Sequence, residues 1–173
     1  MFDPTVFENL KVAFENQLYD LDNLDRRIDI TNRRDRLELA VMSREFALQF
    51  ALADRSGVTA EIQLRASLKD LAAEILELKG ETPACTLRLR FYMKINDVQL
   101  SCEQAEQILQ RVWQPDTAPT QTISYVHGMS PPVYSNTIEL SFNRKITEEQ
   151  MEDLPELIEH MLLSLEQLQE IAL

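Results

Sequence analysis

Residues 45–65, EFALQFALADRSGVTAEIQLR, contain two alternating apolar patterns separated by a short polar segment. Apolar side chains stand at every second position over 46–52 and again over 58–64. A period of two places these side chains on one face of a β-strand. The intervening residues 54–57 are typical of a turn, in which Gly57 can adopt a positive φ. The stretch therefore predicts a β-hairpin with one face against a core and the other toward solvent.

The same alternation and helix-period apolar stripes predict the remaining elements. Leu37, Leu39 and Val41 share one face of an expected strand, and Ile28 and Ile30 indicate a short strand before it. Strands are expected near 26–31, 37–41, 46–52, 58–64, 87–95, 121–127 and 133–143, with a turn at 32–35 between the first two. Helices are expected over about 4–18, 67–80, 101–113 and 147–171.

Helix-capping residues support these four helices. Asp3-Pro4 suits a helix start, and Ser67 and Gly80 suit the two ends of the second helix. Ser101 with Gln104, and Thr147 with Gln150, have the spacing of capping boxes. A break or kink is expected at Pro155.

The resulting order is α-β-β-β-β-α-β-α-β-β-α, which predicts an α+β fold. We expect an antiparallel sheet of about six to seven strands with helices packed on one face. The 173 residues fit a single domain over 1–173. The expected core on the covered face of the sheet contains Phe46, Leu48, Phe50, Ile62, Leu64, Leu89, Phe91, Met93 and Leu140, and Ile138 and Phe142 are expected on the buried face of the last strand.

Composition narrows the classes of partner and the compartment. The net charge of −12 argues against nucleic-acid binding, which requires neutralised phosphates. No apolar run approaches the ~20 residues of a membrane helix, so we expect no membrane span. The N-terminus lacks the pattern of a secretory signal, and Cys85 and Cys102 form no CxxC pair. We therefore expect a cytoplasmic protein with reduced cysteines.

Charge is unevenly distributed along the chain. Residues 26–44 carry six arginines and a net +3, whereas residues 146–173 carry eight acids and no Lys or Arg. This pattern favours pairing between the Arg-rich segment and the acidic tail over recruitment of a ligand. The acids of the last helix are otherwise expected on a solvated face.

Catalytic and cofactor motifs are missing from the sequence. The three glycines, at 57, 80 and 128, cannot build a P-loop or a dinucleotide-binding loop, and there is no G-x-S-x-G. His127, His160 and the two cysteines lack the paired spacing of metal ligands. We expect no cofactor and no metal, with a dyad of either cysteine with His127 as the minor catalytic alternative.

Two groups of residues are candidates for binding. Arg88, Arg90 and Lys94 form a basic row on the outer face of a strand. Cross-strand pairing with Glu61, Glu45 or Glu38 is the simpler explanation. The alternative is a surface that binds an acidic or C-terminal helix of a partner.

The second candidate is the segment 117–138, which contains no Lys, Arg, Asp or Glu. It includes Tyr125, His127, Met129 and Tyr134, and aromatic and Met residues without charge are typical of the centres of interfaces. A hairpin that folds onto its own domain is the simpler explanation. The alternative is a contact between two copies of the chain.

These observations favour a non-enzymatic cytoplasmic protein, namely a protein-interaction or chaperone-like adaptor that acts as a homodimer. In size, acidity and mix of helix and sheet, the chain resembles small secretion chaperones, a similarity of composition alone. The alternative is a small-molecule enzyme with a pocket between sheet and helices. If the protein is an enzyme, we expect titratable groups that converge in a deep pocket. If it is a binding protein, we expect an exposed apolar patch.

Overall fold

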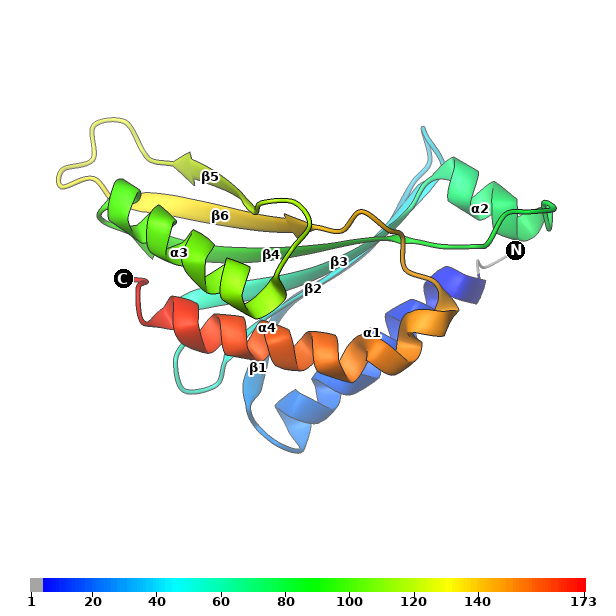
Figure 1. Cartoon of the computed structure of the whole chain (residues 1–173), viewed down its shortest axis with the longest axis horizontal. Helices are drawn as coiled ribbons and strands as arrows, with labels where there is room; N and C mark the ends of the chain where they lie inside the picture. The colour runs from blue at the N-terminus through cyan, green and yellow to red at the C-terminus, as the bar shows by residue number, and fades with distance from the viewer. Residues whose placement is uncertain (1–4) are drawn as a thin grey trace.

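Six antiparallel strands form one sheet in the computed structural model, which describes residues 5–173 (Figure 1). The spatial order is β1-β2-β3-β4-β6-β5, so β1 and β5 are the two edges. The strands are β1 (Ile28–Glu38), β2 (Ser43–Leu52), β3 (Val58–Ala66), β4 (Thr86–Ile95), β5 (Thr120–Ser124) and β6 (Tyr134–Ser141). The helices are α1 (Thr5–Asn23), α2 (Leu68–Ile75), α3 (Val98–Trp113) and α4 (Leu154–Gln169), with a 3-10 helix η1 (Glu148–Asp153) before α4. The expected α+β class is confirmed.

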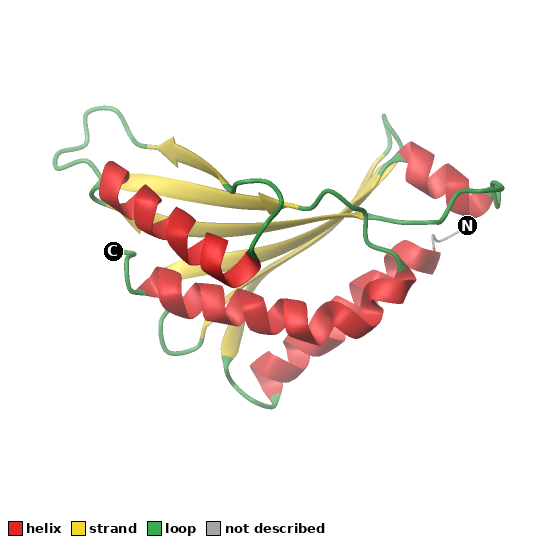
Figure 2. Cartoon of the chain, viewed as in Figure 1, coloured by secondary structure: helices red, strands yellow, loops and turns green. Residues whose placement is uncertain are grey.

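Helices α1, α3 and α4 cover one face of the sheet, and α2 lies at its end (Figure 2). The hairpin predicted from residues 45–65 is β2–β3, in which Phe46 pairs with Leu64 and Leu48 with Ile62. All nine residues of the expected core are buried and belong to one apolar cluster. Apolar side chains of α1, such as Phe7 and Phe14, complete this cluster from the helix side.

The opposite face of the sheet, which we term the open face, has no described helix over it (Figure 2). Because successive side chains alternate, the residues between the core positions point to this face. They are mostly polar and include Gln49, Glu61, Arg88, Arg90 and Glu139. The open face is therefore a polar surface built on the back of the core.

The two strands expected near 26–31 and 37–41 are in fact one strand, β1, so three strands rather than four lie between α1 and α2. The expected turn at 32–35 lies inside β1, where it pairs with residues 46–49 of β2. A bulge between Ile30 and Asn32 shifts the alternation by one residue, which made one strand resemble two. The real turn is at 39–42, so Leu39 and Val41 are exposed rather than in a strand.

Several element ends also differ from the prediction. Helix α2 ends at Ile75, and Gly80 lies beyond it in a loop rather than at the helix end. Helix α3 begins before Ser101, because the Asp97 side chain accepts a hydrogen bond from the Leu100 N–H at 3.0 Å.

The last helical region and the last strand agree with the prediction in part. The Thr147–Gln150 capping box is confirmed, and it opens η1; Pro155 then marks the start of α4. Ile138 and Leu140 of β6 are buried, but Phe142, which follows the end of β6, is 40% exposed, contrary to expectation. The proposed start at Asp3-Pro4 lies outside the described residues.

Candidate functional site

The centre of the open face is Glu61 of β3, whose side chain is completely buried although no described helix covers it. Its Oε2 accepts hydrogen bonds from Gln49 Nε2 at 2.7 Å and from Arg34 Nη2 at 3.0 Å. Its Oε1 accepts one from the Tyr92 hydroxyl at 3.2 Å and lies 3.6 Å from Arg90 Nη1. These four side chains, from β1, β2 and β4, shield the carboxylate from water. Burial and the negative charge of Glu61 together raise the pKa of the Tyr92 hydroxyl.

The basic row on β4 is partly neutralised from the neighbouring strand β6. Arg90 Nε lies 2.9 Å from Glu139 Oε2, and Arg88 Nε lies 3.3 Å from Glu139 Oε1. Because Arg90 also lies 3.6 Å from Glu61, the expected pairing with Glu61 is present for Arg90. Pairing of this row with Glu45 or Glu38 is not seen in the described part of the chain. Glu139 was missed because the sequence does not specify which strand lies beside β4.

Basic charge remains unpaired near the ends of strands β1, β3 and β4, within the described residues. Arg36, Arg65 and Lys94 are exposed and make no ion pair within residues 5–173. The structure thus leaves Lys94 available, whereas Arg88 and Arg90 are held by carboxylates. The open face therefore does not present the row of three equivalent basic groups that the sequence predicted.

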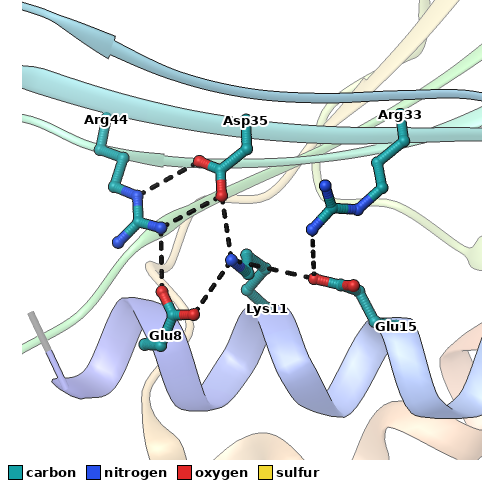
Figure 3. A network of polar contacts seen from close by, with 6 residues as sticks. All are labelled: Glu8, Lys11, Glu15, Arg33, Asp35 and Arg44. Atoms are coloured by element: carbon teal, nitrogen blue, oxygen red, sulfur yellow. Dashed lines mark hydrogen bonds and ion pairs between the residues drawn. The ribbon is translucent and has the colours of Figure 1, made fainter. Parts of the chain in front are cut away.

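The Arg-rich segment is neutralised mainly by α1 rather than by the acidic tail (Figure 3). Asp35 lies 2.9 Å from Lys11 and 3.1 Å from Arg44, and Arg44 also reaches Glu8 at 2.9 Å. Burial by itself would raise the pKa of Asp35, but hydrogen bonds from Arg44 and Lys11 outweigh it and lower that pKa. The full network consists of Glu8, Lys11, Glu15, Arg33, Asp35 and Arg44.

The expected pairing with the last helix is limited to one contact. Arg27 Nη1 lies 2.9 Å from Glu159 Oε1 of α4, and both side chains are largely exposed. The expected pairing of residues 26–44 with the acidic tail is therefore confirmed for Arg27 alone, whereas Arg33 and Arg44 pair with α1. The bulge in β1 is the reason, because it turns Arg33 and Asp35 toward α1.

The uncharged segment forms the edge strand β5, the following loop and the start of β6. Tyr125 and Tyr134 pack edge to face with ring centroids 5.5 Å apart, and Tyr125 is 64% exposed. His127 and Met129 are exposed in the loop, which extends past the end of the sheet (Figure 1). The structure thus brings the two tyrosines together and leaves the loop largely solvent-accessible. The expected strand over 121–127 is shorter, because β5 ends at Ser124.

A second exposed apolar region was missed by the sequence analysis. Eight large apolar side chains are exposed at the end of the sheet where α2 begins. Arg44 pairs with Ala66, two residues before α2, which places the end of the β1–β2 hairpin beside the start of α2. We term this region the apolar tip cluster; it contains Leu37, Leu39, Val41, Met42, Leu68, Ile75, Leu76 and Leu78.

The sequence did contain a signal for this cluster. Leu37, Leu39 and Val41 were expected on one face of a strand, and the helix expected over 67–80 includes Ile75 and Leu76. A helix as short as α2 has few turns with which to bury such residues. Apolar residues at the ends of short elements can therefore lie on the surface.

Sites for catalysis are poorly developed in the described structure. An apolar cleft of about 350 Å³ between the sheet and α4 contains neither His nor Cys; its lining is Leu87, Phe142, Arg144, Lys145, Ile146, Gln150, Asp153, Leu154 and Leu157. Residues 5–173 contain no group of three or more His, Cys, Asp or Glu that could hold a metal ion.

The cysteines and histidines are not arranged as a catalytic pair. Cys85 is buried, and burial together with the charges of Asp70 and Glu74 raises its pKa to about 12. Cys102 is partly buried and accepts a weak hydrogen bond from Asn136. In the described part of the chain, neither cysteine is hydrogen-bonded to His127.

No protein-family model, curated protein sequence or solved structure matches the chain. Among the described helices, none has both the length and the apolar character needed to cross a membrane.

Proposed function

We propose that the protein is a non-enzymatic, cytoplasmic adaptor or chaperone-like protein that binds another protein and acts as a homodimer. The observation that supports this proposal is the apolar tip cluster. Large exposed apolar patches are uncommon on soluble monomers and are typical of sites of protein contact, so the concentration of exposed apolar side chains in this region favours a binding role. The cluster combines a β-turn and a short helix, and it suits an apolar segment of a partner. Nucleic acid and membrane are not proposed partners, because the net charge of −12 opposes binding to phosphates and to anionic lipid.

The test is a comparison of proteins captured by three matched baits. The first is the wild-type chain, and the second carries Leu39→Ser, Val41→Ser and Leu76→Ser in the apolar tip cluster. The third carries Val12→Ser, Leu24→Ser and Leu163→Ser, which remove the same number of exposed apolar side chains elsewhere. Circular dichroism melts establish that all three baits are folded.

We expect at least one protein to be enriched by the wild type and the third bait and lost from the second. After purification, we expect this captured protein to bind the wild-type chain directly, with an affinity at least about tenfold higher than for the second bait. The second bait lacks three apolar contacts that the wild type would bury in the complex. Identical captured sets for all three baits would argue against the apolar tip cluster as the binding site.

The alternative function is that of a small-molecule enzyme, which would use the apolar cleft beside α4. Arg144, Lys145 and Asp153 are its titratable groups, and Lys145 is already engaged by an ion pair with Asp70. This lining suits an apolar ligand with an anionic group better than acid–base chemistry, which requires two groups in contrasting environments. We therefore favour the adaptor.

A further inference from the structure

The edge strand β5 offers unpaired backbone groups to a further strand. On one side, its five residues pair with β6, from Thr120 opposite Glu139 to Ser124 opposite Ser135. On the other side, no described strand pairs with it. The outward N–H and C=O groups of an edge strand form a template for another strand.

Charge distinguishes this edge from the other edge of the sheet. The outer strand β1 carries Arg33, Arg34, Asp35 and Arg36 within four residues, and charged side chains of this kind protect an edge from association. In contrast, β5 lies within the uncharged segment 117–138. Two chains of net charge −12 repel one another, and a contact through an uncharged strip keeps that repulsion smallest.

We propose that β5 pairs in antiparallel fashion with β5 of a second copy, which joins the two sheets into one. This inference rests on the homodimer of the proposed function and specifies its interface. A symmetric pairing of a five-residue strand is centred on Thr122, which then faces Thr122 of the second copy. Thr120 faces Ser124 in the same arrangement. All three side chains are small, exposed and hydroxylated, and cross-strand Thr–Thr and Thr–Ser pairs are favourable.

The two tyrosines next to β5 add apolar contact to this pairing. In the register centred on Thr122, Tyr125 lies opposite Pro119 of the second copy. Tyr125 is 64% exposed, and its ring is already held in place by Tyr134. A fixed aromatic side chain loses little conformational entropy on binding, so it contributes efficiently to an interface.

The pairing also determines how the open faces are arranged. The two-fold axis of an antiparallel strand pair is perpendicular to the sheet, so the helices of both copies lie on the same side. The two open faces then form one continuous polar surface of twice six strands. The two copies of β4 lie five strand spacings apart, or about 24 Å. The dimer therefore presents two Lys94 side chains on a single surface.

A charge-exchange experiment tests this interface. One variant carries Thr120→Lys, Thr122→Lys and Ser124→Lys, and a second carries Glu at the same three positions. In either variant, like charges face each other across the two-fold axis, and we expect self-association to weaken at least about tenfold. In an equal mixture, opposite charges face each other and the dimer re-forms. The matched control is Asn16→Lys, Gln17→Lys and Asn23→Lys, on exposed positions of α1 near the other edge.

Sedimentation equilibrium at micromolar concentration is the measurement. We expect twice the 20.0 kDa chain mass for the wild type, the α1 control and the mixture, and 20.0 kDa for each edge variant alone. A monomeric wild type would overturn both the homodimer and this interface. Dimeric edge variants would overturn the β5 pairing alone and leave a homodimer through another surface.

Disulfide trapping provides a second measurement, which does not depend on disrupting the dimer interface. Directly opposed residues in an antiparallel pair have Cα atoms about 4.5–5.5 Å apart, which suits a disulfide. Mild oxidation of the Thr122→Cys variant is therefore expected to give a covalent dimer, whereas the wild type, with Cys85 buried and Cys102 partly buried, stays uncross-linked. A dimeric Thr122→Cys variant that fails to cross-link would overturn the register centred on Thr122.

Discussion

Arg34 Nη2 lies 3.0 Å from Oε2 of Glu61, a carboxylate with no exposed surface on a sheet face that no helix within residues 5–173 covers. The polar side chains of the neighbouring strands thus take the place of a covering layer. Gln49 and Tyr92 complete the hydrogen bonding of the carboxylate, so its burial leaves neither oxygen unpaired. This hydrogen-bonded layer explains how the open face remains a polar surface without exposing the core beneath it.

Replacement of Glu61 tests whether this layer stabilises the fold. Glu61→Gln keeps the shape but removes the charge, and it leaves Arg34 and Arg90 without their shared partner. We expect a loss of about 2–3 kcal/mol in urea unfolding, since removal of one member of a buried ion pair is strongly destabilising. Glu139→Gln is the control, and its more exposed pair predicts a loss of about 1 kcal/mol or less. Equal losses for the two variants would mean that burial of Glu61 has no special role.

Leu89 of β4 tests the core on the covered face. Its side chain is fully buried at the centre of the sheet, so Leu89→Ala should reduce the free energy of unfolding by about 2–5 kcal/mol. Leu39→Ala is the comparison, because that side chain is 71% exposed and its replacement should change stability by less than about 0.5 kcal/mol. A loss below about 1 kcal/mol for Leu89→Ala would remove Leu89 from the core.

The alternating patterns predicted the sheet because burial of one face leaves a period-two record in the sequence. Phe46, Leu48, Ile62 and Leu89 all lie where this pattern placed them. The pattern failed in β1, because a bulge after Ile30 breaks the alternation without any glycine or proline to mark it. A local irregularity in the backbone is stabilised by its tertiary neighbours, which a single sequence does not display.

The candidate sites were predictable only in part, for a related reason. Composition alone indicated the uncharged segment around Tyr125, and the structure places its strand at an edge. The partnership of Arg90 with Glu139 depends on β4 pairing with β6, which the order of strands along the chain does not determine. The apolar tip cluster depends on where short elements end, and element ends are governed by local packing more than by periodicity.

The ion-pair network around Asp35 predicts a loss of stability in acid. Asp35 and Glu8 have pKa values below their ordinary values of 3.8 and 4.5, because hydrogen bonds and charge from Arg44 and Lys11 outweigh the effect of burial. A carboxyl group whose pKa is lower in the folded state than in the unfolded state stabilises the fold. This contribution is complete at pH values above the ordinary pKa, and it is lost as the pH falls through the lower folded-state pKa. We expect Asp35→Asn to be less stable than the wild type at pH 7 in urea unfolding, and the difference to shrink below about pH 4. A difference that stays constant from pH 7 to pH 3 would exclude this linkage.

The contact between Arg27 and Glu159 should contribute little. Both side chains are largely exposed, and isolated pairs of this kind contribute about 0–1 kcal/mol. We therefore expect Arg27→Ala to lower the melting temperature only slightly, and salt to reduce that small difference further. Arg44→Ala provides the contrast, since Arg44 binds both Asp35 and Glu8 and its guanidinium lies 4.6 Å from the centre of the Phe7 ring. A larger loss for Arg27→Ala than for Arg44→Ala would restore the acidic tail as the main partner of the Arg-rich segment.

The two cysteines should react with alkylating agents at different rates. Burial, followed by the negative charges of Asp70 and Glu74, raises the pKa of Cys85 to about 12, and reaction requires the thiolate. Burial also raises the pKa of Cys102, but this side chain is only partly buried and is therefore the more accessible thiol. With iodoacetamide at pH 8, peptide mass spectrometry should show Cys102 modified first and Cys85 modified at a comparable rate only in denaturant. The backbone of Cys85 is hydrogen-bonded to Ile146 in both directions at 2.8 Å, so early modification of Cys85 would show that this bridge opens in the native protein.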